Sequence, residues 1–271
     1  MAFVERDGAR IHWNALGKGE PLVLIMGLGC CSSMWFRLAP RLARRYRVIM
    51  LDNRGVGRTE VPHFVVHRVT TMADDVAAVL DAAGEPTAHV FGLSMGGMVA
   101  QQFAIDHSTR LRSLLLAATN CGGIRAILPE SNVWQLLFRK GDLGPEEALN
   151  GMRPFTYSSR TAESLIQEDH LVRLANYPTP RGYQAQLYGL MGWTSWNQLP
   201  QLRCPTLVLH GRDDQLIPPE NGGLVASRIP GAELIELDNA SHWIHTDQLD
   251  ATTAAVQGFI DKVETNTRRL T

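Results

Sequence analysis

FGLSMGG, residues 91–97, places three glycines around one serine. An apolar run precedes it and a stretch with helical spacing follows it, which predicts a sharp connection from strand to helix at Ser94. Gly92 and Gly96 lack side chains, so the strand and the helix can approach closely at the turn. A serine in such a turn lies at the carboxyl end of its strand, where open α/β sheets bind ligands. Ser94 is therefore a candidate nucleophile.

Buried-strand patterns alternate with helical patterns on both sides of this turn. Such alternation predicts an α/β fold, a mostly parallel twisted sheet with helices on both faces. A helical pattern is expected over residues 33–45 and another after Thr70 or Thr71, ending at Gly84. Continuous apolar runs predict strands at 21–27, 47–53, 88–94, 113–119 and 205–211, and a further strand is expected at 232–238.

Residues 122–196 have a different character. They contain no buried-strand run, their helical patterns are broken by prolines, and they hold nearly half of the aromatic residues of the chain. We interpret this segment as a helical lid inserted into a core domain formed by residues 1–121 and 197–271. Its aromatic side chains pack the lid itself, and some of them are expected to face the cavity beneath.

A serine nucleophile needs a general base and an acid that orients the base. HGRDDQLIP, residues 210–218, follows a late strand and offers Asp213 and Asp214. ASHWIH, residues 240–245, follows the last strand and offers His242 and His245. The residues alone leave both choices open. A His-x-x-His pair is also a metal-binding spacing, but no third ligand is evident, so no metal is expected.

Taken together, these motifs make the chain resemble the α/β-hydrolase fold family over essentially its full length. The resemblance rests on MGLG (26–29), DNRGVGRT (52–59), GLSMGG (92–97), GRDDQLIP (211–218) and SHW (241–243). It implies that the catalytic acid is Asp214, three residues after the glycine that ends the late strand, and that the base is His242. Asp213 is then a turn residue.

The same resemblance implies an oxyanion hole formed by two backbone N–H groups. One belongs to Met95, directly after the nucleophile, and the other to Leu28, in the loop after the first apolar strand. Many relatives read His-Gly-x at that loop, whereas this chain reads Met-Gly-Leu at 26–28. Two such donors would stabilise a tetrahedral oxyanion, since removing one typically costs about 3 kcal/mol. No organic cofactor is expected.

The composition and charge of the chain argue against a nucleic-acid partner and against a membrane-spanning segment. The formal net charge is -1, and we find no basic run of the kind that binds nucleic acid. The charged residues near the start are unlike a secretory signal, and no apolar stretch reaches the roughly 20 residues of a membrane span. The four cysteines lack metal-binding spacing, which favours reduced thiols in a cytoplasmic protein. The sequence leaves the oligomeric state open, and a homodimer is one of the alternatives.

The reaction expected from these residues is hydrolysis of a carboxylic ester or lactone through an acyl-enzyme on Ser94, with an apolar or aromatic substrate of small to medium size. GLSMGG and CPTLVLHG (204–211) are similar to the enol-lactonase and small carboxylesterase branches of the family. The alternatives are a C–C bond hydrolase or a cofactor-free oxidative enzyme with the same triad, and a small-molecule receptor that retains the triad. In DNRGVGRT the Gly-Lys-Ser/Thr ending of a phosphate loop is absent, so we expect a structural turn there, with Asp52 and Arg54 joining loops.

Overall fold

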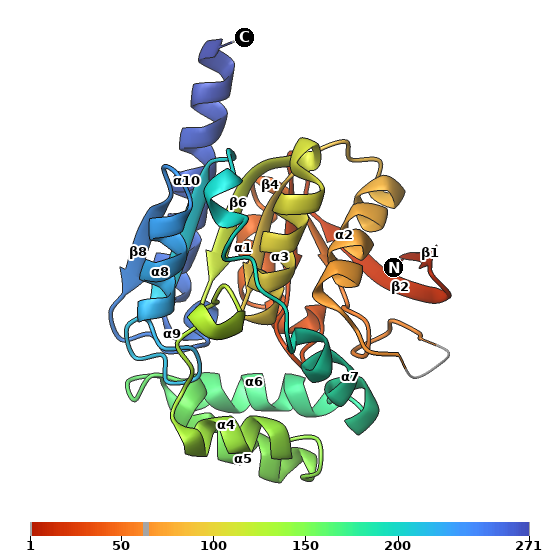
Figure 1. The fold of residues 1–271 in the computed structure, drawn as a ribbon, viewed down its shortest axis with the longest axis vertical. Coiled ribbons are helices and arrows are strands. Elements are labelled where there is room, and N and C mark those ends of the chain that lie inside the picture. Colours follow the sequence, from red (N-terminus) through yellow and green to blue (C-terminus); the bar gives the residue numbers. More distant parts are fainter. Residues whose placement is uncertain (1, 62–64, 271) are drawn as a thin grey trace.

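The computed structural model describes residues 2–61 and 65–270, and Figure 1 shows their fold. Eight strands form one sheet in the order β1-β2-β4-β3-β5-β6-β7-β8. The first two strands pair antiparallel with their neighbours and all other pairs are parallel. The strands are β1 Ala2–Arg6, β2 Ala9–Leu16, β3 Glu20–Ile25, β4 Tyr46–Leu51, β5 Ala88–Leu93, β6 Leu111–Ala117, β7 Thr206–Gly211 and β8 Glu233–Leu237.

Helices cover both faces of this sheet, and each face has its own apolar core. Successive side chains of a strand point to opposite faces, so Val23 and Ile25 of β3 pack into one core and Leu22 and Leu24 into the other. The first core lies under α2 Val69–Ala83, α3 Met95–Asp106 and α8 Glu220–Arg228. The second lies under α1 Leu38–Leu42 and α10 Leu249–Leu270, and the short α9 Ile244–Asp247 precedes α10.

Four helices form an insertion between β6 and β7, and Figure 1 shows them gathered at one end of the sheet. They are α4 Ser131–Arg139, α5 Pro145–Thr156, α6 Glu163–Ala175 and α7 Pro180–Leu190. We call these four helices and their connections the lid. The fold class predicted from the sequence is thus confirmed, while the domain boundaries at residues 121 and 197 stay a prediction.

Two local features differ from the sequence prediction. The helix expected over residues 33–45 is split into a short 3-10 turn, Ser32–Trp35, and α1. Pro40 explains the break, because its ring clashes with the carbonyl of the residue four positions earlier, Phe36. The β1–β2 hairpin was not predicted. Its signal is the Asp7-Gly8 pair, whose φ angles of 45° and 69° form the tight turn that joins the two strands.

A third correction concerns the start of α2. The helix begins at Val69 with Arg68 at its N-cap, so Thr70 and Thr71 lie inside the first turn and cap nothing. The predicted end is correct, because Gly84 has the left-handed conformation, with φ 72°, that commonly terminates helices.

The loop that follows β4 is held by buried charges. The Arg54 guanidinium donates to both oxygens of Asp75 on α2, over 2.7 and 2.8 Å. Asp52 accepts from the backbone N–H and the hydroxyl of Ser32 and from the backbone N–H of Arg58. These contacts give the loop the structural role that the sequence analysis assigns to it. Across the described ranges, no helix combines the length and apolarity needed to cross a membrane.

The Arg54–Asp75 pair supplies the first testable prediction. Arg54→Met should lower the free energy of unfolding by about 3 kcal/mol, because it removes the bidentate partner of the buried Asp75 and leaves it the longer contact with Arg6 at 3.1 Å. Arg45→Met is the matched control, since Arg45 pairs with Asp261 on the exposed surface and should cost at most about 1 kcal/mol. Urea denaturation measures both. Equal losses in the two variants would contradict the structural role of Arg54.

Candidate active site

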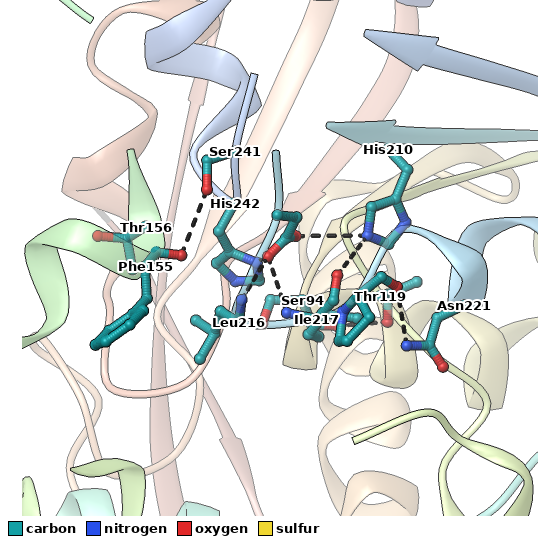
Figure 2. Close-up of polar contacts among 12 residues, drawn as sticks. Ser94, Thr119, Phe155, Thr156, His210, Leu216, Ile217, Asn221, Ser241 and His242 are labelled. Atoms are coloured by element: carbon teal, nitrogen blue, oxygen red, sulfur yellow. Dashed lines mark hydrogen bonds and ion pairs between the residues drawn. The ribbon is translucent and has the colours of Figure 1, made fainter. Parts of the chain in front are cut away.

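Ser94 lies between β5 and α3 in a strained backbone conformation. Its φ is 58° and its ψ -122°, a combination that non-glycine residues rarely adopt. Two hydrogen bonds hold this turn: the Ser94 N–H donates to the Ala117 carbonyl over 2.9 Å, and the Thr119 hydroxyl donates to the Ser94 carbonyl over 2.8 Å. Figure 2 shows Ser94 and Thr119 together with the polar residues around them. The strand-to-helix turn predicted from FGLSMGG is therefore present.

Each glycine of this turn is required by a close contact. A Cβ atom on Gly92 would lie 2.1 Å from the Gly96 carbonyl oxygen, and one on Gly96 would lie 2.1 Å from the Ile25 carbonyl oxygen. A Cβ atom on Gly97 would lie 2.6 Å from the Thr119 side chain. All three distances are shorter than real Cβ contacts, so no other residue fits without moving backbone or the Thr119 side chain.

The structure brings Asp214 to His242, and it directs Asp213 elsewhere. His242 Nδ1 donates to Asp214 Oδ2 over 2.9 Å, and both side chains are buried. Asp213 is exposed and accepts a hydrogen bond from Ser158 of the lid over 3.0 Å. Because Nδ1 of His242 is occupied by Asp214, Nε2 is the nitrogen left to exchange a proton with another group.

Asp214 is held by hydrogen bonds to both of its carboxylate oxygens. Its Oδ1 accepts from the backbone N–H groups of Leu216 and Ile217 over 2.9 and 2.8 Å. Burial alone would raise the pKa of Asp214, but the charges of His242 and His210 and their hydrogen bonds outweigh it and lower the pKa to about 2. The carboxylate is therefore ionised at neutral pH.

His210 is a neighbour of this carboxylate that the sequence analysis did not assign. Its Nε2 lies 3.4 Å from Asp214 Oδ2 and 2.9 Å from the Ile217 carbonyl, as Figure 2 shows for His210 and Ile217. By donating to the Ile217 carbonyl, His210 fixes the loop that carries Asp214. The signal in the sequence is the spacing of four residues between His210 and Asp214 across the end of β7.

The loop after β3 passes directly beside Ser94. A Cβ atom on Gly27 would lie 3.0 Å from Ser94 Cβ and 3.4 Å from Ser94 Oγ, closer than most Cβ contacts, so a larger residue there would press on the Ser94 side chain. Asn53 donates to the Met26 carbonyl over 2.9 Å and so fixes the start of this loop. The Leu28 N–H thus belongs to a segment in contact with the serine. Met95 is the first residue of α3, a position whose N–H has no partner within its own helix.

Gln186 of α7 joins the lid to this loop. Its side-chain oxygen accepts from the Gly29 N–H over 2.8 Å, and its side-chain nitrogen donates to the Arg54 carbonyl over 2.7 Å. The residue is fully buried. Nothing in the sequence distinguishes it from the other polar residues of the lid, which is why it was not predicted. Through the bond to Gly29, Gln186 fixes the position of the Gly27–Gly29 segment relative to the lid.

Asp247 joins the lid to the loop that carries His242. Its carboxylate accepts from the Ser241 N–H over 2.7 Å, from the Ser158 N–H over 3.1 Å and from the Thr161 hydroxyl over 2.6 Å. Burial raises the pKa of Asp247 to about 6, and the three hydrogen bonds oppose that rise. The positions of the lid and of His242 are therefore coupled.

A cavity of about 340 Å³ lies between the sheet edge and the lid. Ser94, His242, Leu28 and Met95 all line it, so the four residues face one space. Among the described residues no hydrogen bond joins Ser94 Oγ to His242, a contact that often forms only when substrate binds. Most of the lining is apolar, and the lid contributes three of the aromatic residues noted in the sequence: Trp134, Phe138 and Tyr183.

His245 lies away from this cavity. Its ring packs between Trp35 and Trp243, and burial lowers its pKa to about 3, with the charges of His242 and Arg37 adding to the effect. Across residues 2–61 and 65–270, no group of three or more His, Cys, Asp or Glu side chains is arranged to hold a metal ion.

Comparison with known proteins agrees with this architecture. The family described as alpha/beta hydrolase fold matches residues 20–249. A putative carbamate hydrolase RutD of Azorhizobium caulinodans is 28% identical over 97% of this chain and all of its own length. A poly(3-hydroxyalkanoate) depolymerase of Ectopseudomonas oleovorans is 31% identical over 96% of this chain and 92% of its own.

A solved structure shows the same fold. The enol-lactonase of Burkholderia xenovorans superposes with a TM-score of 0.86 at 25% identity, over 96% of this chain and 99% of its own. The family match spans most of the chain, including the turn at Ser94 and the residues that meet at Asp214 and His242. The chain therefore belongs to the alpha/beta hydrolase fold family.

Proposed function

We propose that this hydrolase cleaves a carboxylic ester or a lactone through an acyl-enzyme on Ser94. The observation that carries the proposal is the arrangement of one strained serine and one Asp214–His242 pair on a single cavity. The serine supplies a nucleophile, the histidine a base with a free Nε2, and the buried carboxylate an acid that stays ionised. Acyl transfer requires these three groups and no organic cofactor.

The proposed reaction has two halves. His242 Nε2 takes the proton from Ser94 Oγ, which attacks the carbonyl carbon, and His242 then gives that proton to the leaving alcohol. Water loses a proton to His242, attacks the acyl-enzyme and releases the acid, and the proton returns to Ser94. Throughout, Asp214 fixes the tautomer of His242 and stabilises its charged form. The N–H groups of Leu28 and Met95 donate to the oxyanion in both halves.

The cavity supports a substrate of small to medium size, because its walls are mostly apolar and its volume is about 340 Å³. Its outer part is formed by partly exposed apolar residues of the lid region: Leu128, Trp134 and Met191. The relatives are named for a carbamate, a polyester and an enol-lactone, so carbamates and lactones belong in the substrate panel beside p-nitrophenyl esters. A diketone in the same panel tests C–C bond hydrolysis, and very slow turnover with every member would favour a receptor.

Covalent labelling tests the nucleophile. A fluorophosphonate probe should label the wild type at Ser94, and Ser94→Ala should abolish labelling and lower ester hydrolysis about 10³-fold or more. Ser227→Ala is the control, because Ser227 is exposed on α8 and its hydroxyl donates to the Leu224 carbonyl of the same helix. Intact mass measurement and steady-state kinetics give both readouts. Retained labelling or activity in Ser94→Ala would show that another residue is the nucleophile.

A pair of neighbouring carboxylates tests the acid. Asp214→Asn should lower kcat about 10³-fold or more, because an amide cannot stabilise the charged form of His242 and favours the wrong tautomer. Asp213→Asn should change kcat by less than about threefold, since its amide oxygen still accepts from Ser158. Comparable losses in the two variants would overturn the assignment of Asp214.

The lowered pKa of Asp214 also predicts a pH dependence of stability. A folded pKa of about 2 lies below the unfolded value of about 3.9, so the ionised carboxylate stabilises the fold above pH 4 by roughly 2 kcal/mol. That contribution is lost as the pH falls from about 4 to about 2. The difference in unfolding free energy between wild type and Asp214→Asn should therefore shrink across this interval. Asp213→Asn is the control. If the difference in unfolding free energy between wild type and Asp214→Asn stayed constant from about pH 4 to about pH 2, the pKa of Asp214 would not be lowered.

A further inference from the structure

Two buried cations line the cavity, and the proposed mechanism assigns neither of them a role. Lys140 follows α4 and is 6% exposed, and Arg173 lies in the last turn of α6 and is 8% exposed. Both line the cavity that holds Ser94 and His242. Charged residues are almost never buried to this degree without a partner of opposite charge, so their partners decide their role.

Neither cation has a carboxylate partner in the described part of the chain. The Lys140 ammonium lies 5.0 Å from the centre of the Tyr183 ring, and the Arg173 guanidinium lies 5.2 Å from that of Trp243. Arg173 also shares a hydrogen bond with the neutral Tyr157 hydroxyl. The acid nearby, Asp169, forms an ion pair with Arg37, which takes up its charge.

The electrostatics of Lys140 agree with an unpaired cation. Burial lowers its pKa to about 8, and the charge of Arg173 adds to that lowering, while only the Cys30 thiol acts in the opposite direction. A third polar group lies beside the two cations. Tyr177 lines a separate small pocket together with Lys140 and Arg173, and its hydroxyl is buried without a hydrogen-bond partner among the described residues. Three donor groups, none of them paired with a carboxylate in the described part of the chain, thus meet beside Cys30.

The surroundings lower the cost of these charges without supplying an anion. Both cations lie at the C-terminal ends of lid helices, where the helix dipole favours positive charge, and both face aromatic rings. Neither feature satisfies the N–H donors of an ammonium or a guanidinium. A carboxylate does so, because it accepts several hydrogen bonds and is matched by the planar fork of arginine.

We propose that Lys140 and Arg173 form an anion-binding subsite of the cavity, and that the substrate is an ester or lactone that carries a carboxylate group. The carboxylate binds at the subsite while the reacting carbonyl lies at Ser94. The claim about the substrate rests on the proposed function, whereas the claim about anion binding does not. An apolar cavity with a cationic end selects such half-polar molecules over neutral esters of the same size.

Binding without turnover tests the subsite by itself. Ser94→Ala protein is titrated with adipate and with its neutral counterpart adipamide, and calorimetry measures both affinities. We expect adipate to bind at least about tenfold more tightly, and we expect Lys140→Met or Arg173→Met in that background to remove the difference. Arg139→Met, which removes an exposed cation from the same end of α4, should preserve it. Equal binding of the two compounds to the Ser94→Ala protein would overturn the subsite.

Catalysis tests the substrate class. The p-nitrophenyl monoester of adipic acid is compared with its methyl ester, and the ratio of kcat/KM values is the readout. The ratio should favour the acid in the wild type, should fall about 10- to 100-fold in Lys140→Met, and should be preserved in Arg139→Met. A wild-type ratio near one would overturn the substrate claim. If neither ester is cleaved but adipate still binds, the proposed function fails and the subsite stands.

A merely structural role for the cations gives a different pattern. Removing a buried unpaired charge should leave the unfolding free energy of Lys140→Met equal to or above that of the wild type. A stability loss together with equal kcat/KM losses on both esters would show that Lys140 supports the lid and binds no anion. Arg173→Met provides the second variant, so the proposal does not depend on the behaviour of one substitution.

Discussion

The strained backbone of Ser94 is the constraint on which the rest of the site depends. A non-glycine residue at this φ costs of order 1–3 kcal/mol, so surrounding contacts must hold it. Those contacts come from the two strands beside β5: the Ile25 carbonyl at the end of β3, the Ala117 carbonyl of β6 that accepts from the Ser94 N–H, and Thr119 just after β6. The turn at Ser94 is therefore fixed by the centre of the parallel sheet. Its geometry is a property of the whole core.

The other groups of the site are fixed by the junction of core and lid. Gln186 holds the segment that carries Leu28, and Asp247 holds the loop that carries His242. Gln186 is fully buried and reaches from the lid to two core segments, whereas Asp247 is partly buried and bonds Ser241 in the core and Ser158 in the lid. A displacement of the lid would consequently disturb His242 and the segment that carries Leu28 together, while the turn at Ser94 would keep its shape. The lid thus controls the alignment of the site as well as the shape of the cavity.

The sequence predicted those features that depend on local pattern. Continuous apolar runs identified the five buried parallel strands β3 to β7, and FGLSMGG identified the turn, because buried parallel strands and glycine contacts leave clear local signals. The expected strand at 232–238 is also present as β8, although most of its residues are exposed. The hairpin of β1 and β2 was missed because both strands mix apolar and polar residues and neither contains a continuous apolar run, although Asp7-Gly8 marks its turn. Gln186, His210 and the two lid cations could not be found this way. Their roles come from contacts between segments far apart in the chain, which periodicity does not record.

The lid cations also show how stability and function oppose each other in this fold. Apolar residues of similar volume at Lys140 and Arg173 would avoid the desolvation of two charges, and such replacements are often neutral or stabilising. The fold therefore buries two cations without carboxylate partners among the described residues, and both line the cavity that Ser94 also lines. A bound carboxylate would restore the missing partner and recover that free energy only in the complex. The cost of burying the cations in the free protein is then the source of their selectivity, because a neutral substrate of the same shape cannot relieve it.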